Sequence, residues 1–356
     1  MEQVKGRGAQ SGDVSTRFGL STREADGDWR DEVEAIDGSA PKLRTDVTIE
    51  HPRSILSFNQ SPDIGFDRSV NAYRGCEHGC IYCFARPTHA YLDLSPGLDF
   101  ESKLFAKPTA AKLLAETLAK PGYSPRPIAM GTNTDPYQPI ESRYRITREV
   151  LEVCLDARHP VTITTKSDRV LADLDLIEEM ARKSLIAVAI SVTSLDPHLS
   201  RLIEPRAPSP AKRLSALGRL AETGVPAHCS IAPVIPAITD DAMEGIVARA
   251  AALGVRSAGW IPLRLPHEVA PLFREWLDTH FPDRKDKVMG IVRSIRNGRD
   301  NDPDFFSRMK PSGVWADLFR ARFKLACRRA GLDRPKFDLD CSQFRAPMVG
   351  GQMRLL

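Results

Sequence analysis

Two apolar patterns alternate along the chain between residues 70 and 263. Short apolar runs, several rich in β-branched residues, predict strands at residues 70–73, 127–131, 161–165, 186–192, 227–231 and 257–263. Apolar residues at helical spacing between them predict helices at residues 112–119, 146–157, 171–181, 211–222 and 241–252. Such alternation is typical of parallel βαβ units. The pattern therefore predicts an α/β fold, with fewer units than a closed eight-stranded barrel requires.

The alternation does not extend to either end of the chain. Residues 1–45 are polar and lack apolar periodicity, which predicts a disordered tail. Beyond residue 265 only helices are expected, at residues 271–281, 288–296 and 314–330. We therefore divide the chain into a tail (1–45), an α/β domain (46–265) and a helical, basic extension (266–356).

Composition is that of an ordinary globular protein, with 42% hydrophobic and 27% charged residues. No apolar run is long enough to span a bilayer, and the first residues lack the apolar stretch of a signal peptide. The seven cysteines are odd in number and include a tight triplet, which argues against a disulfide framework. We expect a cytoplasmic, monomeric protein that does not associate with membranes.

The triplet is Cys76, Cys80 and Cys83, in the spacing C-x3-C-x2-C. Thiolates this close can all reach one metal centre, and soft sulfur ligands select zinc, copper(I) or an iron–sulfur cluster. A structural zinc site needs four protein ligands, which His78 would complete. Three cysteines on a cluster would instead leave one iron open to a small molecule. The spacing alone leaves both centres open.

The triplet, with an aromatic residue just before its last cysteine, resembles the cluster motif of the radical S-adenosylmethionine (SAM) superfamily. The resemblance implies a partial (β/α)6 barrel in which Cys76, Cys80 and Cys83 hold a [4Fe–4S] cluster. It also implies that the cluster binds SAM and cleaves it reductively to a 5′-deoxyadenosyl radical. Flanking Cys83, Tyr82 is a candidate to shield or relay the radical, and a flavodoxin or ferredoxin would supply electrons.

The expected strand ends add candidate residues for SAM binding, because the active site of such barrels lies at the carboxyl ends of the strands. The run Thr134-Asp135-Pro136-Tyr137-Gln138-Pro139-Ile140-Glu141 resembles the spore photoproduct lyase-like branch. The same branch has a lysine at the position of Lys166. The resulting candidates are Gly131, Thr132, Asn133, Asp135, Lys166, Ser191, Thr193 and Arg206.

Two residues depart from that branch. Thr132 aligns with the cysteine that donates hydrogen in spore photoproduct lyases, and Phe84 aligns with a second tyrosine. A hydroxyl is a far poorer hydrogen-atom donor than a thiol. The SAM chemistry therefore carries over better than the thymine-dimer reaction, and the substrate stays unidentified.

Basic residues concentrate in the extension, where residues 284–336 hold 15 Lys or Arg against 6 Asp, with aromatic residues among them. This pattern fits a nucleic-acid-binding surface or, alternatively, an amphipathic helical cap with its charges outward. We predict a radical SAM enzyme with nucleic acid favoured as substrate. The alternatives are a zinc-stabilised nucleic-acid-binding protein without catalysis and a radical SAM enzyme that modifies a protein or peptide.

Overall fold

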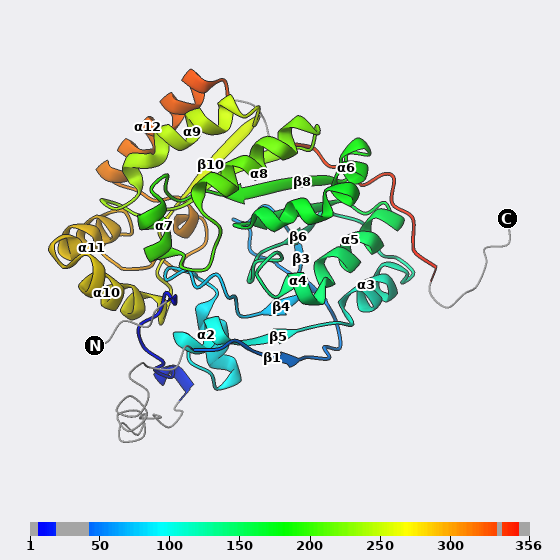
Figure 1. The fold of residues 1–356 in the computed structure, drawn as a ribbon, viewed down its shortest axis with the longest axis horizontal. Coiled ribbons are helices and arrows are strands. Elements are labelled where there is room, and N and C mark those ends of the chain that lie inside the picture. The colour runs from blue at the N-terminus through cyan, green and yellow to red at the C-terminus, as the bar shows by residue number, and fades with distance from the viewer. Residues whose placement is uncertain (1–5, 19–42, 333–336, 349–356) are drawn as a thin grey trace.

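A seven-stranded sheet forms the centre of the molecule, in the order β10-β9-β8-β7-β6-β3-β2 (Figure 1). The structure, a computed structural model, describes residues 6–18, 43–332 and 337–348 of the 356-residue chain. Strands β3 and β6 to β10 are parallel neighbours, and β2 runs antiparallel to β3 at one edge. The strands are β2 Leu56–Phe58, β3 Arg68–Val70, β6 Ile128–Met130, β7 Val161–Thr165, β8 Ile186–Ser191, β9 Ala227–Val234 and β10 Ser257–Pro262.

The helices that connect these strands form an outer layer running from α3 to α9 (Figure 1). Apolar strand residues such as Ile186, Val188 and Ile190 are completely buried, as expected of a sheet covered on both faces. Six parallel strands in chain order, with helices outside, make the partial (β/α)6 barrel that we predicted. The helices are α3 Ala110–Leu118, α4 Glu141–Tyr144, α5 Ile146–Asp156, α6 Leu174–Arg182, α7 Pro197–Ile203, α8 Pro210–Glu222 and α9 Met243–Ala252.

Local signals explain where several of these helices begin and end. Helix α7 follows Asp196, whose carboxylate accepts a hydrogen bond from the backbone N–H of His198 at 2.8 Å. Helix α8 has Pro210 in its first turn, where the missing N–H costs nothing. Its chain then turns at Gly224, with φ +76°, a conformation that favours glycine.

A small second sheet was missed by the sequence analysis. It has the order β1-β5-β4 and consists of β1 Asp46–Ile49, β5 Lys103–Ala106 and β4 Tyr73–Arg74. The single strand predicted at residues 70–73 is in fact divided, because β3 ends at Val70 in the main sheet and β4 begins at Tyr73 in the small one. Strand β1 is mostly exposed, so it carries little apolar signal. The remaining short elements are α2 Leu98–Ser102, η1 Thr16–Phe18, η2 Arg86–Leu92, η3 Asp168–Asp173, η4 Asp240–Ala242, η5 Pro282–Arg284 and η6 Ser307–Met309.

Part of the predicted disordered tail is packed on the domain, which corrects the prediction for residues 6–18. Ala9 is completely buried, and the backbone N–H groups of Gly8 and Ala9 donate to the Glu101 carboxylate at 2.9 and 2.8 Å. A polar, glycine-rich segment can be ordered in this way, because a buried acceptor replaces the apolar core that it lacks. Residues 1–5 and 19–42 of the predicted tail lie outside the described residues.

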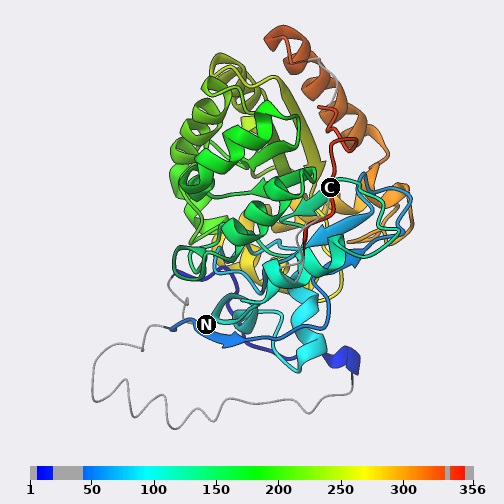
Figure 2. The same ribbon diagram turned by 90° about the vertical axis from the view of Figure 1, so that its right-hand side faces the viewer.

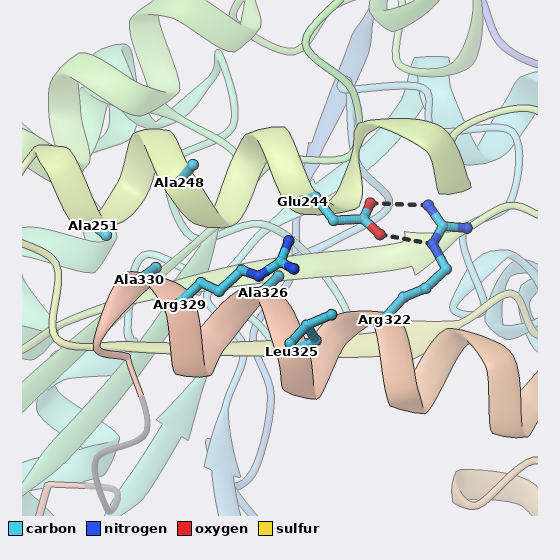
Figure 3. A pocket seen from close by; sticks show the side chains of 8 residues that line it. All are labelled: Glu244, Ala248, Ala251, Arg322, Leu325, Ala326, Arg329 and Ala330. Carbon is cyan, nitrogen blue, oxygen red and sulfur yellow. Dashed lines mark hydrogen bonds and ion pairs between the residues drawn. The ribbon is translucent and has the colours of Figure 1, made fainter.

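The C-terminal extension is helical, as predicted, with α10 Val269–His280, α11 Lys285–Ser294 and α12 Val314–Ala330. Helix α12 lies beside α9, where the Arg322 guanidinium binds the Glu244 carboxylate at 2.7 Å (Figure 3). In the side view, α12, drawn in brown, stands at the upper right, and the green helices of the barrel lie to the left (Figure 2). Phe319 of α12 is buried and packs against the Trp260 ring of β10.

Several long cations in the described part of this extension are paired within the structure. Asp63 neutralises Arg308, Asp300 neutralises Arg293, and Asp278 neutralises Lys285. These contacts favour the amphipathic cap for much of the predicted basic surface. No helix among the described residues is long and apolar enough to cross a membrane.

Candidate active site

The three cysteines lie on a loop between β4 and η2. Cys76 and Cys80 are 7% and 8% exposed, and Cys83 is half-buried. The loop is held at both ends of the triplet: the Cys76 N–H donates to the Phe100 carbonyl at 2.9 Å, and the Cys83 N–H donates to the Cys80 carbonyl at 3.1 Å. The loop is therefore a defined structure that presents its thiols from fixed backbone positions.

The thiols face a cavity of about 230 Å³ at the carboxyl ends of the barrel strands. Residues from the ends of β6, β7, β8, β9 and β10 complete its lining. The structure thus brings together most of the residues that the sequence analysis proposed for the site. They are Cys76, Cys80, Tyr82, Cys83, Gly131, Thr132, Asn133, Asp135, Lys166 and Ser191.

Thr193 and Arg206, the other two candidates, do not line this cavity. The Thr193 hydroxyl donates to the buried Glu204 carboxylate at 2.7 Å. The Arg206 guanidinium binds a carboxylate, as its chemistry suggested, but that carboxylate is Glu77 of the cysteine loop, at 2.8 Å. Both side chains hold the surroundings of the site together, and neither is directed to a ligand in the cavity.

Gly131 lines the cavity where β6 ends and the following loop approaches β7. Its φ is +88°, and a Cβ atom there would meet the Thr164 carbonyl oxygen at 1.9 Å. Only glycine fits this close approach of two backbones. The next residue, Thr132, exchanges hydrogen bonds with the Asn71 side chain at 3.1 and 3.2 Å. The sequence 131–133 therefore brings backbone and short side chains to the cavity wall.

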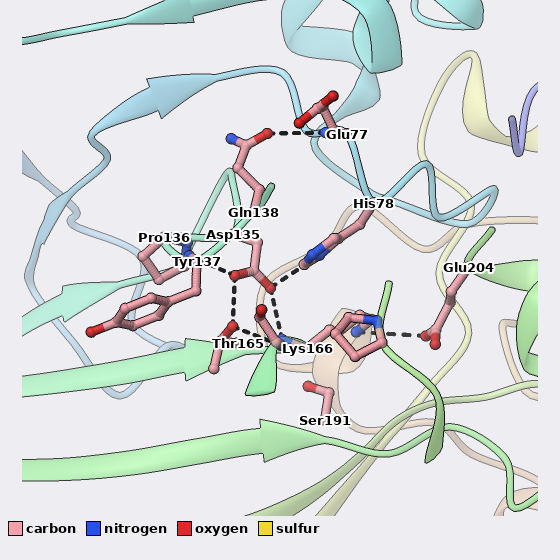
Figure 4. Close-up of polar contacts among 12 residues, drawn as sticks. Glu77, His78, Asp135, Pro136, Tyr137, Gln138, Thr165, Lys166, Ser191 and Glu204 are labelled. Carbon is pink, nitrogen blue, oxygen red and sulfur yellow. Dashed lines mark hydrogen bonds and ion pairs between the residues drawn. The ribbon is translucent and has the colours of Figure 1, made fainter. Parts of the chain in front are cut away.

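Asp135 is the centre of a buried network beside the cysteine loop (Figure 4). Its carboxylate accepts from the Thr165 hydroxyl at 2.6 Å and from the Lys166 backbone N–H at 2.7 Å, and it lies 3.3 Å from His78 Nδ1. Burial raises the pKa of Asp135, but the attraction of His78 and these donors outweighs burial and lowers it to about 2. Asp135 is therefore an anion that ties the loop to β7.

Gln138 fastens the same loop on both sides of Cys76, and Figure 4 shows its bond to Glu77. Its side-chain amide accepts from the Glu77 N–H at 3.0 Å and donates to the Gly75 carbonyl at 3.1 Å. Gln138 is completely buried, so both bonds are shielded from water. In the sequence, Gln138 stands out only as part of the motif at residues 134–141. Its place between Pro136 and Pro139 is the one local signal, whereas its burial and its two bonds emerge only from the fold.

Glu204 is a second buried centre that the sequence analysis missed. Its side chain is completely buried, binds the Arg213 guanidinium at 2.5 Å, and accepts the Tyr82 hydroxyl hydrogen bond. The Lys166 ammonium lies 3.9 Å away and 5.7 Å from the centre of the Tyr82 ring. Burial raises the pKa of Glu204, but Arg213 and Lys166 outweigh it and lower the pKa to about 2. Glu204 thus orients the ring and the ammonium that face the cavity.

Glu101 is the third such centre, behind the cysteine loop. It binds the Arg86 guanidinium at 2.5 Å, and both side chains are completely buried. Arg86 in turn donates to the Cys80 carbonyl at 3.0 Å and the Gly79 carbonyl at 3.2 Å. The loop carbonyls, the N-terminal segment 6–18 and α2 therefore meet at one buried ion pair.

The donor set fits a metal centre with positive charge. Burial raises the pKa of all three thiols, and the Asp135 and Glu204 carboxylates raise those of Cys76 and Cys80 further. Thiolates crowded in this way need a cation beside them, and metal coordination deprotonates a thiol. Among the residues that the structure describes, no three Cys, His, Asp or Glu side chains converge on a single ion. A cube-shaped iron–sulfur cluster does not demand such convergence, because each cysteine binds a different iron.

A family model described as the radical SAM superfamily matches residues 70–250. An uncharacterised protein of Mycobacterium tuberculosis (strain ATCC 25618 / H37Rv) is 38% identical over 233 residues, covering 64% of this chain and 68% of the relative. The chain belongs to the radical SAM superfamily. An uncharacterised protein of Methanocaldococcus jannaschii is 33% identical over 171 residues, covering 48% of this chain and 61% of that protein.

Solved structures of spore photoproduct lyase share the fold of this radical SAM protein. One point mutant has a TM-score of 0.59 at 13% identity, covering 80% of both chains. A double mutant with bound AdoMet and dinucleoside spore photoproduct has a TM-score of 0.57 at 13% identity, covering 85% of this chain and 91% of the other. The predicted superfamily and the lyase-like fold are confirmed. Membership also sets aside the alternative of a zinc-stabilised binding protein without catalysis.

Proposed function

We propose that this radical SAM enzyme holds a [4Fe–4S] cluster through Cys76, Cys80 and Cys83 and binds SAM in the adjoining cavity. One observation carries the proposal: the three thiols line the same cavity as residues from the ends of five parallel strands. When bound, the cluster supplies the electron that cleaves SAM to methionine and a 5′-deoxyadenosyl radical, which abstracts hydrogen from the substrate.

The chain's own residues position SAM in this proposal. Gly131, Thr132 and Asn133 offer backbone groups and small side chains to the amino acid part of SAM. Lys166, whose ammonium also donates to the Ala232 carbonyl at 3.3 Å, faces the carboxylate of SAM with a positive charge. Ser191 offers a hydroxyl to the ribose. Since Glu204 already holds the Lys166 ammonium and the Tyr82 hydroxyl, these groups need little reorganisation when SAM binds.

Tyr82 acts in this proposal by position, through its ring. Its hydroxyl donates to Glu204, and burial and that carboxylate raise the pKa of Tyr82 well above its usual range. The phenol is therefore neutral and its hydroxyl is hydrogen-bonded to Glu204. The ring forms part of the cavity wall beside Cys80 and Cys83. Asp135 likewise acts by holding the cysteine loop, because its carboxylate oxygens already accept hydrogen bonds from other groups of the protein.

A nucleic acid is the substrate class that we propose. Spore photoproduct lyase has been solved with a dinucleoside substrate, and this chain shares its fold. Lys310, Lys324 and Arg328 are exposed and have no carboxylate within 4.0 Å among the described residues, so they remain available to phosphates. Thr132 takes the place of a thiol donor, so the reaction differs from dimer cleavage. A flavodoxin or ferredoxin as electron donor and a monomeric state complete the proposal.

The test is made anaerobically on the reconstituted full-length protein. We expect about four irons with matching sulfide per chain, and 5′-deoxyadenosine after SAM and dithionite are added. Cys83→Ala should abolish deoxyadenosine formation, whereas Cys341→Ala, at a half-buried cysteine outside the cavity, should retain it. One zinc with no iron after reconstitution, or intact SAM in the iron-loaded protein, would refute the proposal. Gel shifts with DNA and RNA at increasing salt test the substrate class separately.

A further inference from the structure

Arg264 lines the cavity just after β10 and lacks a counter-ion. Its Nη1 donates to the Met309 sulfur at 3.4 Å, and its Nε is buried with no hydrogen-bond partner among the described residues. No carboxylate of the described chain lies within 4.0 Å of this guanidinium. A thioether is a weak acceptor. Removing part of a guanidinium from water without a stronger partner is energetically unfavourable.

The other long cation on the cavity wall is compensated. The Lys166 ammonium lies 3.9 Å from the Glu204 carboxylate. In the described part of the lining, Arg264 is therefore the cationic side chain left without an anionic partner. Contact with water does not account for the missing partner, because the Nε of Arg264 is buried.

The charged groups around Arg264 are two arginines, Arg308 and Arg296, and two carboxylates, Asp63 and Asp302. Arg308 nearby is neutralised by Asp63, at 2.6 and 2.7 Å, so that carboxylate is already engaged. Arg296 is buried and donates to the Leu263 carbonyl at 2.9 Å and the Arg308 carbonyl at 2.6 Å. Burial and Arg264 together lower the pKa of Arg296 to about 10, with Asp302 opposing. Burial and Arg308 lower the pKa of Arg264, with Asp63 and Asp302 opposing. An anion in the cavity would relieve this repulsion.

We propose that Arg264 is the binding site for an anionic group, a carboxylate or a phosphate, on the substrate that enters the cavity beside SAM. A guanidinium binds either group bidentately. The inference rests on the proposed function, which makes this cavity the place of reaction. Lys166 already faces the SAM carboxylate in that proposal. Arg264 follows β10, which lies at one edge of the sheet order. Strand β3, whose end leads towards the cysteine loop, lies next to the other edge.

Inorganic phosphate is the probe. We would titrate it calorimetrically into the reconstituted wild-type protein, with and without saturating SAM, at constant ionic strength. Arg264→Gln should weaken phosphate binding at least about tenfold, and Arg264→Lys should weaken it less, because it keeps the charge and loses the planar fork. Arg329→Gln is the matched control, at an exposed arginine of α12 outside the cavity, and should bind phosphate as wild type does.

Unchanged phosphate affinity in Arg264→Gln would overturn the site. Phosphate binding that competes with SAM would overturn the assignment to substrate and identify the SAM carboxylate as the occupant. Should Arg264→Gln fold poorly, as judged by circular dichroism and iron content, Arg264→Lys gives the same decision. If the wild-type protein forms deoxyadenosine but does not bind phosphate through Arg264, only the proposed anion site is refuted. If it binds phosphate through Arg264 but leaves SAM intact, the proposed function is refuted instead.

Discussion

The two walls of the cavity differ in how charge is compensated. Around the cysteine loop, the carboxylates of Asp135, Glu204 and Glu101 are buried and engaged. Glu204 and Glu101 each pair with an arginine at 2.5 Å, and Asp135 accepts hydrogen bonds from Thr165 and the Lys166 N–H at 2.6 and 2.7 Å. On the β10 wall, Arg264 has no carboxylate within 4.0 Å in the described chain, and neither has Arg296, which donates to the neighbouring Leu263 carbonyl. A wall whose charges are satisfied is rigid before any ligand binds. A wall with an uncompensated cation gains most when a ligand arrives.

The difference assigns separate tasks to the two walls. The loop that holds the cysteines is fixed from three directions, by Asp135, Gln138 and the ion pair of Arg86 with Glu101. Such support is what a metal centre requires, because surrounding hydrogen bonds orient its ligands. The β10 wall is assembled from the C-terminal half of the chain. We expect it to differ between enzymes that share the cysteine loop but act on different substrates.

The largest expected effect is the loss of stability when the buried Glu204 carboxylate is neutralised. Glu204→Gln leaves Arg213 completely buried without its anion, which should lower the free energy of unfolding by about 3–5 kcal/mol. Arg264→Gln removes a cation that has no anion, so the free energy of unfolding should stay the same or rise. Urea unfolding of the metal-free proteins measures both. Equal losses in the two variants would contradict the comparison.

Gln138 tests whether the hydrogen bonds around Cys76 support the metal centre. Gln138→Ala removes both bonds to the loop, and we expect the affinity for the cluster to fall about 10–100-fold. Iron retained after gel filtration with a chelator measures the loss. Gln343→Ala is the control, because Gln343 bonds to the Lys183 carbonyl far along the chain from the loop. Equal iron retention in the two variants would show that Gln138 has no such role.

Gly8 tests the support that the N-terminal segment gives to the loop. A Cβ atom at Gly8 would meet the Gly79 carbonyl oxygen at 1.8 Å, so Gly8→Ala should displace the segment 6–18 and lower the free energy of unfolding by about 1–3 kcal/mol. Gly12→Ala is a close control, because its nearest neighbour, a Leu98 methyl group, lies at 4.0 Å. Hydrogen exchange of residues 75–86 should rise only in Gly8→Ala. A rise in both variants, or in neither, would contradict the expectation.

The smallest effect concerns pH and Glu141, a buried carboxyl that accepts from Tyr73 and from the Thr147 N–H at 2.9 Å. Burial raises the pKa of Glu141 to about 7, although these donors oppose it. The folded protein then binds more protons than the unfolded chain between about pH 4.5 and 7, so this group's stabilisation is lost as pH rises through 7.

We therefore expect the free energy of unfolding of wild type to fall by about 1 kcal/mol more than that of Glu141→Gln between pH 6 and pH 8. Denaturant unfolding at the two pH values measures the difference. Glu149→Gln, at an exposed glutamate of α5, should follow wild type. Parallel pH profiles for wild type and Glu141→Gln would exclude a titrating Glu141.

The sequence was sufficient to predict what depends on local pattern. The strand at residues 161–165 and the helix at 314–330 match β7 and α12 residue for residue, because their periodicity reflects which face each residue buries. The cysteine triplet was recognisable because its ligands are neighbours in the chain. Strand β1 and the segment 6–18 were missed, since both depend on partners about 60 to 95 residues away.

Which charges compensate each other was decided only by the tertiary structure. Arg206 and Arg264 are both arginines just after strand or helix ends, and nothing in their immediate sequence separates them. Folding places Arg206 beside Glu77, 129 residues earlier in the chain, and leaves Arg264 without a carboxylate among the described residues. Electrostatic energy depends on the distance between charges in space, on their burial and on other charges nearby, and none of these is a local property of the sequence. Local sequence therefore determined the barrel and its cysteine motif, and the tertiary structure determined which cation remains available to a ligand.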